Sequence, residues 1–222
     1  DGAWGLSQTN ASIRNEFTAF AGLNYALDAQ LSLYGNYAEI FLPQSQRDVT
    51  GAFLTPVTGR NYEVGIKGDL FEGRALASFA VFRTEQDNIA FEDDTIAESI
   101  ADVQCGGTCY RPSATVRSQG FEAEINGEIL RGLQLSASYT YTSVKYLGDT
   151  PGVGYNISAN TGLPRHILRV WGNYRLPGQW QRLSIGAGMN VQSRASGFGY
   201  NGRIQGGYTV LNARIAYQLT PA

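Results

Sequence analysis

The sequence predicts an all-β fold, an antiparallel up-and-down transmembrane β-barrel. Three observations indicate it: apolar and polar residues alternate over many segments, short and long connections alternate between those segments, and charged residues are scarce. Charged residues make up 16% of the chain, against about 25% in ordinary soluble domains. The mean hydropathy is nevertheless −0.21, and no apolar run approaches the roughly 18 residues of a membrane-spanning helix.

The composition excludes several other classes of protein. A hydrophobic content of 43% with 13 tyrosines is too high for a disordered chain. Lysine and arginine together number 17 against 19 acidic residues, so no nucleic-acid partner is expected. The first residues, from Asp1 on, show no signal-peptide pattern, which predicts that a leader was removed or that the sequence is an internal piece.

The first four predicted strands are identified by their period of two. In 61–70, Tyr62, Val64 and Ile66 share one face, and charged residues share the other. The pattern of the fourth is less regular, because Phe79, Val81 and Phe82 do not all fall on one face. These four strands are predicted at 16–27, 30–41, 61–70 and 75–90.

The next five predicted strands alternate more clearly. In the first of them, Phe121, Ala123 and Ile125 oppose a row of glutamates, and in the last Leu211 and Ile215 lie on an apolar face. The five are predicted at 117–130, 134–146, 164–176, 181–194 and 207–218. Each of these nine segments is long enough for the roughly 9–11 residues that a tilted strand needs to cross a bilayer.

The connections alternate in length. Short turns are predicted at 28–29, 71–74, 131–132 and 177–179, and long segments at 42–60, 91–116, 147–163 and 197–206. Outer-membrane barrels have short periplasmic turns and long extracellular loops, whereas ordinary hairpin loops have about 2–5 residues. The asymmetry favours a membrane barrel over a soluble β-sandwich, which stays open as an alternative.

The two faces of the strands suit lipid on one side and water on the other. Five tyrosines lie towards the ends of the predicted strands and are expected to form an interfacial girdle, although in a sandwich they would be cross-strand packing residues; they are Tyr25, Tyr37, Tyr139, Tyr141 and Tyr217. Charges of both signs lie on the opposite faces, as in a hydrated lumen. The row Glu122, Glu124 and Glu128 is interpreted as lumen wall rather than as catalytic carboxylates.

Two further features bear on chemistry. Cys105 and Cys109, separated by Gly-Gly-Thr, favour a local disulfide in an oxidising compartment, with a pair of free thiols as the alternative. A metal site is not expected there, because the only histidine is His166. His166 shares the apolar side of its strand, so a Ser–His–acid triad is not expected and the protein is predicted not to be an enzyme.

Several motifs in register resemble one family. The segment NYEVGIKGDLFEGR at 61–74 and its continuation to 89 closely resemble the barrel of TonB-dependent ferric-siderophore receptors, of the hydroxamate or pyoverdine type. The flanking segments agree, and they are FAGLNYAL at 20–27, LYGNYAEIFLPQ at 33–44, SQGFEAE at 118–124, LPRH at 163–166 and QSR at 192–194. The resemblance implies that 1–222 is part of one barrel domain of about 22 strands, with the plug domain and the final strands absent.

The resemblance also implies a function, namely uptake of ferric siderophores across the outer membrane of a Gram-negative cell. The expected partners are the ferric siderophore, outer-membrane lipid and the TonB complex, the last through the absent N-terminal region. No cofactor or protein metal ligand is expected, because iron arrives already chelated. The alternatives are a small passive porin-like barrel and a soluble β-rich binding module.

Candidate ligand-binding residues are chosen by position and chemistry, not by a family motif. Aromatic rings can stack on a chelate, and arginine or tyrosine can donate to its anionic oxygens. The loop residues of this kind are Tyr110, Arg111, Tyr155, Phe198, Tyr200 and Arg203, with Arg194 at the outer end of a strand. The alternative for each is loop packing or plain solvation.

Overall fold

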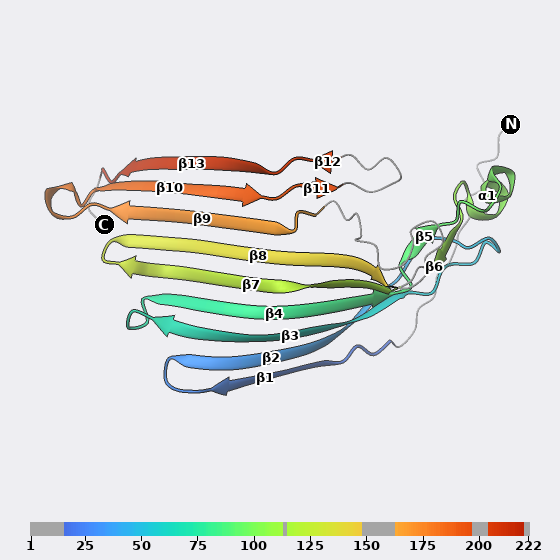
Figure 1. Cartoon of the computed structure of the whole chain (residues 1–222), viewed down its shortest axis with the longest axis horizontal. Helices are drawn as coiled ribbons and strands as arrows, with labels where there is room; N and C mark the ends of the chain where they lie inside the picture. Colours follow the sequence, from blue (N-terminus) through green and yellow to red (C-terminus); the bar gives the residue numbers. More distant parts are fainter. Residues whose placement is uncertain (1–15, 113–114, 148–162, 197–203, 220–222) are drawn as a thin grey trace.

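In the computed structural model, residues 16–112, 115–147, 163–196 and 204–219 are described. Nine strands of this part form one sheet in the order β1-β2-β3-β4-β7-β8-β9-β10-β13, and every neighbouring pair is antiparallel (Figure 1). The strands are β1 Phe20–Ala26, β2 Leu31–Leu42, β3 Val57–Leu70, β4 Ala75–Asp87, β7 Thr115–Leu130, β8 Leu133–Leu147, β9 His166–Arg175, β10 Leu183–Gln192 and β13 Tyr208–Tyr217. All four short turns lie at one end of the sheet.

The predicted all-β class and the nine predicted strands are confirmed, with differences in their bounds. The third strand begins at Val57 rather than at 61, so the loop before it is shorter than predicted. The fourth ends at Asp87, and its irregular pattern has a simple origin. Phe79 and Val81 face the apolar side, whereas Phe82 lies on the polar face, where it pairs with Glu63 and with Gly120.

Side chains stabilise the short turns. In the first, Asp28 Oδ1 accepts hydrogen bonds from the backbone N–H groups of Gln30 at 2.7 Å and Leu31 at 2.8 Å, as aspartate does in turns. In the turn between β7 and β8, Glu128 Oε1 accepts from the N–H of Gly132 at 2.6 Å. These local bonds fix the register of each hairpin.

The register places the apolar residues of neighbouring strands on one continuous face. Directly paired residues share a face of the sheet, and such pairs include Val64 with Val81 and Val81 with Phe121. All five tyrosines of the predicted girdle lie on this face, since their partners are Leu33, Tyr62, Leu168, His166 and Leu183. Tyr139 and Tyr141 lie near the middle of β8 rather than at its end, which corrects their predicted position.

Ring contacts join the strands on the apolar face. The ring of Phe121 lies 5.8 Å from that of Phe79, 5.7 Å from that of Tyr139 and 5.6 Å from that of Tyr141, centroid to centroid. Aromatic pairs at such distances stabilise a fold by more than the burial of their apolar area alone. Leu23, Val64, Val81 and other large apolar residues remain exposed on this face, which suits contact with lipid.

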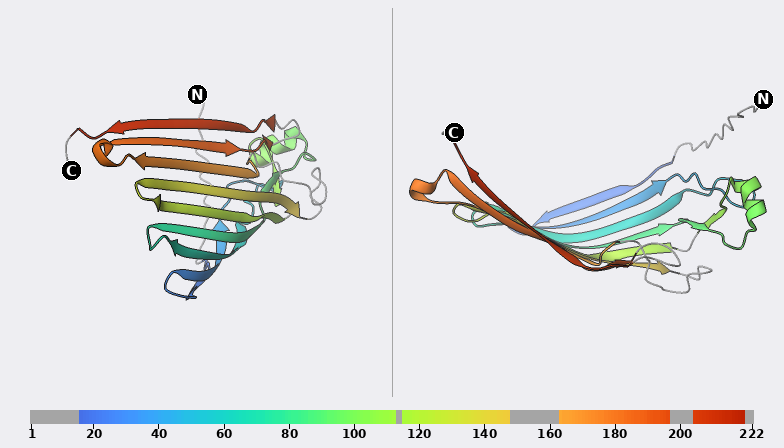
Figure 2. Two further views of the ribbon diagram at one scale, coloured as in Figure 1. Left: turned by 60° about the vertical axis from the view of Figure 1, so that its left-hand side comes forward. Right: turned by 90° about the horizontal axis from the view of Figure 1, so that it is seen from above.

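The opposite face is polar. Register pairs there include Glu124 with Ser138 and Lys67 with Ser78, and Arg169 pairs with Asn190. The sheet is curved and twisted, and β1 and β13 lie at its two edges without pairing with each other (Figure 2). The structure is therefore an open section of a barrel wall.

The only described α-helix, α1 Glu98–Cys105, has eight residues. No helix in the described ranges is long and apolar enough to cross a membrane.

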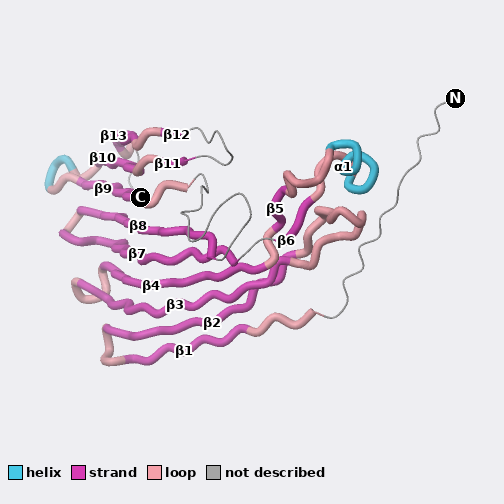
Figure 3. The backbone as a smooth tube through the Cα atoms, turned by 45° about the vertical axis from the view of Figure 1, so that its right-hand side comes forward, coloured by secondary structure: helices cyan, strands magenta, loops and turns pink. Residues whose placement is uncertain are grey.

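Several of the least exposed side chains in the described ranges lie in the long connections, while others, such as Val57, Ala75 and Ala80, lie in the sheet. Cys109 is 2% exposed, Ala101 5% and Leu54 7%. They belong to two connections, 43–56 between β2 and β3 and 88–112 between β4 and β7, which we call the loop module. It lies at the end of the sheet opposite the short turns (Figure 3). Each of the two connections therefore contains at least one buried side chain.

Candidate ligand-binding site

The longer connection of the loop module has its own secondary structure. It contains β5 Ala90–Glu92, α1 and β6 Tyr110–Pro112, and β5 pairs antiparallel with β6. A disulfide joins Cys105 at the end of α1 to Cys109, with the two Cα atoms 5.2 Å apart. Gly106, at the C-terminal end of α1, has a left-handed φ of 74°, which glycine adopts readily. The two glycines between the cysteines thus let the chain reverse from helix to strand.

The shorter connection packs against the longer one. The backbone N–H of Tyr110 donates to the carbonyl of Arg47 at 2.8 Å, and Cys105 Sγ lies 3.1 Å from the carbonyl oxygen of Asp48. The guanidinium of Arg47 lies 4.4 Å from the centroid of the Phe53 ring. The two connections are therefore one folded unit rather than two independent loops.

The loop module also contacts the barrel wall. The ring of Phe91 on β5 meets the ring of Tyr146 on β8 edge to face, with the centroids 6.3 Å apart. Tyr146 is 8% exposed and pairs with Val116, on the face that carries Glu124. This contact places the β5–β6 hairpin on the polar side of the sheet, where a ligand entering the lumen would pass.

Two of the predicted ligand-binding residues lie together on this hairpin. Tyr110 and Arg111 are both in β6 and both are partly exposed. Arg111 Nη1 lies 4.0 Å from Asp93 Oδ1, so the guanidinium has a carboxylate beside it. A ring and a cation on one short strand could contact an anionic, aromatic ligand.

The other predicted residues are not brought to this hairpin. Arg194 is exposed and lies between β10 and β11 Ala195–Ser196, which pairs with β12 Ile204–Gln205. In the sheet, β7, β8 and β9 separate β4 from β10. Tyr155, Phe198, Tyr200 and Arg203 lie outside the described residues, so their predicted role stays a prediction.

Other residues that build this site were not predicted from the sequence. Asp93 and Arg47 were not chosen, although one contacts Arg111 and the other packs on Phe53. Gln44 was also missed, although its side chain bonds to backbone groups up to 46 residues away. No sequence signal identifies a glutamine with such distant partners.

Hydrogen bonds lower the pKa values of two loop carboxyls. The Thr95 hydroxyl donates to Asp93 Oδ1 at 2.6 Å and is the main cause of the lowered pKa of Asp93; partial desolvation opposes it, while the Thr95 N–H and Arg111 add to it. In the same way the Thr50 hydroxyl, 2.6 Å from Asp48 Oδ1, lowers the pKa of Asp48. Both carboxyls are therefore anionic at neutral pH.

Replacing Thr95 with valine is expected to raise the pKa of Asp93 towards its ordinary value. The lowered pKa means that Asp93 stabilises the folded loop above its unfolded-state pKa, near 3.8, and that this contribution is lost as the pH falls through the lower folded-state pKa. The measurement is a titration of the Asp93 carboxyl by carbon NMR in the full-length receptor. An unchanged pKa in Thr95→Val would show that the hydroxyl is not the cause.

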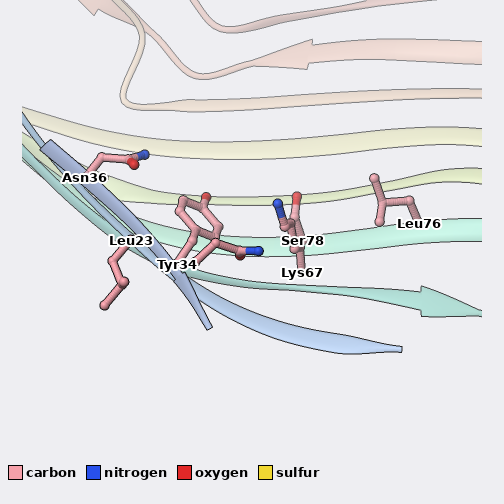
Figure 4. Close-up of a pocket in the computed structure, with 8 residues that line it drawn as sticks. Leu23, Tyr34, Asn36, Lys67, Leu76 and Ser78 are labelled. Atoms are coloured by element: carbon pink, nitrogen blue, oxygen red, sulfur yellow. The ribbon is translucent and has the colours of Figure 1, made fainter. Parts of the chain in front are cut away.

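A hollow lies on the polar face near the short turns. It has a volume of about 500 Å³ and is lined by Asn24, Tyr34, Lys67 and Ser78, among others, from β1 to β4 (Figure 4). The Lys67 ammonium lies 5.8 Å from the centroid of the Tyr34 ring. This hollow is open and belongs to the lumen side of the wall, apart from the loop module.

His166 is engaged on the apolar face, as the sequence predicted. Its Nδ1 lies 2.7 Å from the Tyr139 hydroxyl, and its ring lies 5.0 Å from that of Tyr141. The Ser193 hydroxyl oxygen accepts a hydrogen bond from the backbone N–H of His166, at 3.1 Å, rather than bonding to the imidazole. Within the described ranges, no group of three or more His, Cys, Asp or Glu residues is placed to hold a metal ion.

An antiparallel wall with an apolar outer face, a polar inner face, short turns at one end and a folded loop module at the other defines a transmembrane barrel protein of the outer-membrane type. Residues 2–222 match the family described as TonB dependent receptor-like, beta-barrel. The chain belongs to this family. Its place is therefore the outer membrane of Gram-negative bacteria.

The similar proteins are siderophore receptors. The chain is 40% identical over 215 residues to the ferric-pyoverdine M114 receptor PbuA of Pseudomonas sp. strain M114, covering 95% of this chain and 25% of that protein. It is 34% identical over 216 residues to the ferric-pyoverdine BN7/BN8 receptor of Pseudomonas putida, covering 96% and 24%. The chain thus spans about a quarter of the length of these relatives.

Similar solved structures also belong to siderophore receptors. The ferripyoverdine receptor of Pseudomonas aeruginosa, bound to ferripyoverdine, matches with a TM-score of 0.79 at 29% identity, covering 96% of this chain and 28% of that one. The alcaligin receptor FauA of Bordetella pertussis matches with a TM-score of 0.72 at 32% identity, covering 94% and 33%. The resemblance to TonB-dependent siderophore receptors is therefore confirmed.

Proposed function

We propose that the protein containing this chain is a transporter for ferric siderophores of the pyoverdine type. It binds the Fe(III) chelate at its extracellular loops and imports it with energy from TonB. The observation that carries the proposal is the loop module, which presents Tyr110 and Arg111 on the lumen side of a wall whose sequence relatives are ferric-pyoverdine receptors. A pyoverdine-type chelate is a suitable ligand, because an aromatic anionic surface pairs with tyrosine and arginine.

The same proposal covers partners and chemistry. Lipid contacts the apolar face, TonB acts through the remainder of the receptor, 1–222 is part of its barrel domain, and nucleic acid is not a partner. The protein works without catalysis and without a cofactor of its own, since iron enters as part of the substrate. The absence of catalysis is supported by His166, whose imidazole is hydrogen-bonded to the Tyr139 hydroxyl and not to a serine side chain in the described ranges.

Growth under iron limitation tests the proposed function. Cells that lack the full-length gene are supplied with purified ferric pyoverdine as the sole iron source, and the gene is restored on a plasmid. Restored growth and uptake of radioactive iron from ferric pyoverdine are expected. Loss of uptake when TonB is deleted is the matched control for active transport. If the gene restores neither growth nor binding with any of a panel of ferric pyoverdines and hydroxamates, the proposal is wrong.

A further inference from the structure

Gln44 lies where the two connections of the loop module leave the sheet. It is the second residue after β2, which ends at Leu42. Its Nε2 donates to the carbonyl of Thr55 at 2.6 Å and to the carbonyl of Asn88 at 2.7 Å. Its Oε1 accepts from the backbone N–H of Ala90 at 3.0 Å. One amide side chain therefore satisfies three backbone groups on two separate segments.

The three backbone partners of Gln44 lie at the base of the β5–β6 hairpin, where the chain leaves the sheet. Thr55 lies just before β3, Asn88 lies just after β4, and Ala90 is the first residue of β5. Asn88 has a left-handed φ of 63°, a conformation that turns the chain out of β4 and that asparagine tolerates better than most residues. The Asn88 side chain adds a longer contact, with Nδ2 3.4 Å from the carbonyl of Pro56.

From Ala90 the effect of Gln44 extends to the predicted ligand residues. Ala90 begins β5, and the next residue, Phe91, pairs with Arg111 in β6. Apart from the Asn88–Pro56 contact at the base, the polar contacts described between the two connections are made further out, at Tyr110 and Cys105. Gln44 thus holds the base of the hairpin, while those contacts hold its outer part.

We infer that Gln44 is a positioning residue that joins the two connections and sets the place of the Tyr110–Arg111 strand in the ligand vestibule. The part of the inference that concerns the ligand rests on the proposed function. The joining of the two connections does not, so the two can fail separately. Gln44 does not contact the ligand; it acts through β5.

Hydrogen exchange of the full-length receptor in lipid nanodiscs tests the joining. Gln44→Leu removes all three bonds and leaves Thr55, Asn88 and Ala90 with unpaired backbone groups. Exchange at 88–92 and at residues 110 and 111 is expected to rise about tenfold. Gln46→Leu is the matched control, since no side-chain hydrogen bond of Gln46 is found in the described ranges. Exchange in Gln44→Leu equal to that of the wild type would overturn the inference.

Gln44→Glu separates positioning from simple loss of packing. A carboxylate would repel the two carbonyl oxygens of Thr55 and Asn88, but a protonated carboxyl has one O–H and restores one bond. Exchange at 88–92 in this variant should therefore fall towards the wild-type rate as the pH is lowered, after correction for intrinsic exchange. Neither the wild type nor Gln44→Leu should show this recovery. Exchange in Gln44→Glu with no pH dependence would contradict the inference.

Binding of ferric pyoverdine, measured by fluorescence quenching, gives the second readout. Gln44→Leu should weaken binding about tenfold at neutral pH, and Gln44→Glu should recover affinity relative to Gln44→Leu on acidification. If the wild type binds no ferric pyoverdine while exchange responds as expected, the proposed function fails and the joining of the loops stands. If binding is unchanged in Gln44→Leu although exchange rises, the positioning role is wrong.

Discussion

Replacing Gly120 with alanine is expected to prevent assembly of the barrel wall between β7 and β8. A Cβ atom built on Gly120 would lie 1.8 Å from the carbonyl oxygen of Tyr141 and 3.1 Å from the Phe82 ring. Real side chains never approach a backbone atom so closely, so the β7–β8 ladder would have to shift. Overpacking typically costs about 1–3 kcal/mol, and more where the backbone must move.

The control for Gly120→Ala is Gly172→Ala on β9. A Cβ at Gly172 would meet only the carbonyl oxygen of Ala187, at 3.9 Å, an ordinary contact. The measurement is the amount of heat-modifiable, folded receptor in the outer membrane for each variant. Equal amounts in the two variants would show that Gly120 is not required for close strand approach.

Replacing Val81 with arginine is expected to destabilise the barrel by about 2–4 kcal/mol, the cost of such a charge on the lipid face near the midplane. Val81 is the seventh of the 13 residues of β4, and 48% of its surface is exposed beside Val64 and Phe121. In the complete barrel this exposed surface faces lipid, because the opposite face carries the charges.

Ser78→Arg on the same strand is the matched control. Ser78 pairs with Lys67 and with Glu124 on the polar face, where an added cation stays hydrated and the Glu124 carboxylate offsets its repulsion from Lys67. Equilibrium unfolding in urea from lipid vesicles compares the two variants. A loss in Ser78→Arg as large as that in Val81→Arg would show that the two faces have been assigned wrongly.

The sheet could be predicted from the sequence because its two faces contact different media. The apolar residue Val64, between Glu63 and Gly65, is expected on the lipid side of the wall because its side chain is apolar. The same alternation of apolar and polar or small residues extends along each strand. The pattern is irregular at Phe82, as the sequence indicated, and the structure gives the reason: this aromatic residue covers Gly120 on the polar face. Periodicity cannot indicate that a partner strand leaves room for a ring.

The loop module could not be predicted from the sequence. Helix α1 has only eight residues, and Ala97 at its N-cap supplies no side-chain hydrogen bond, so the usual start signal is missing. The spacing of Cys105 and Cys109 indicated a local disulfide, which the structure contains. Contacts between 43–56 and 88–112 depend on backbone carbonyls such as that of Arg47, and any residue type provides these.

The loop module is built from two segments that β3 and β4 separate along the chain. A chimera that exchanges only 88–112 with a related receptor would receive new partners for Arg47 and Asp48 but keep the old segment that faces them. The buried residues of the loop module, Leu54 in one connection and Ala101 and Cys109 in the other, would then come from two different proteins. Ligand preference, where it depends on this part of the receptor, is therefore transferable only as a two-segment graft that moves both connections together.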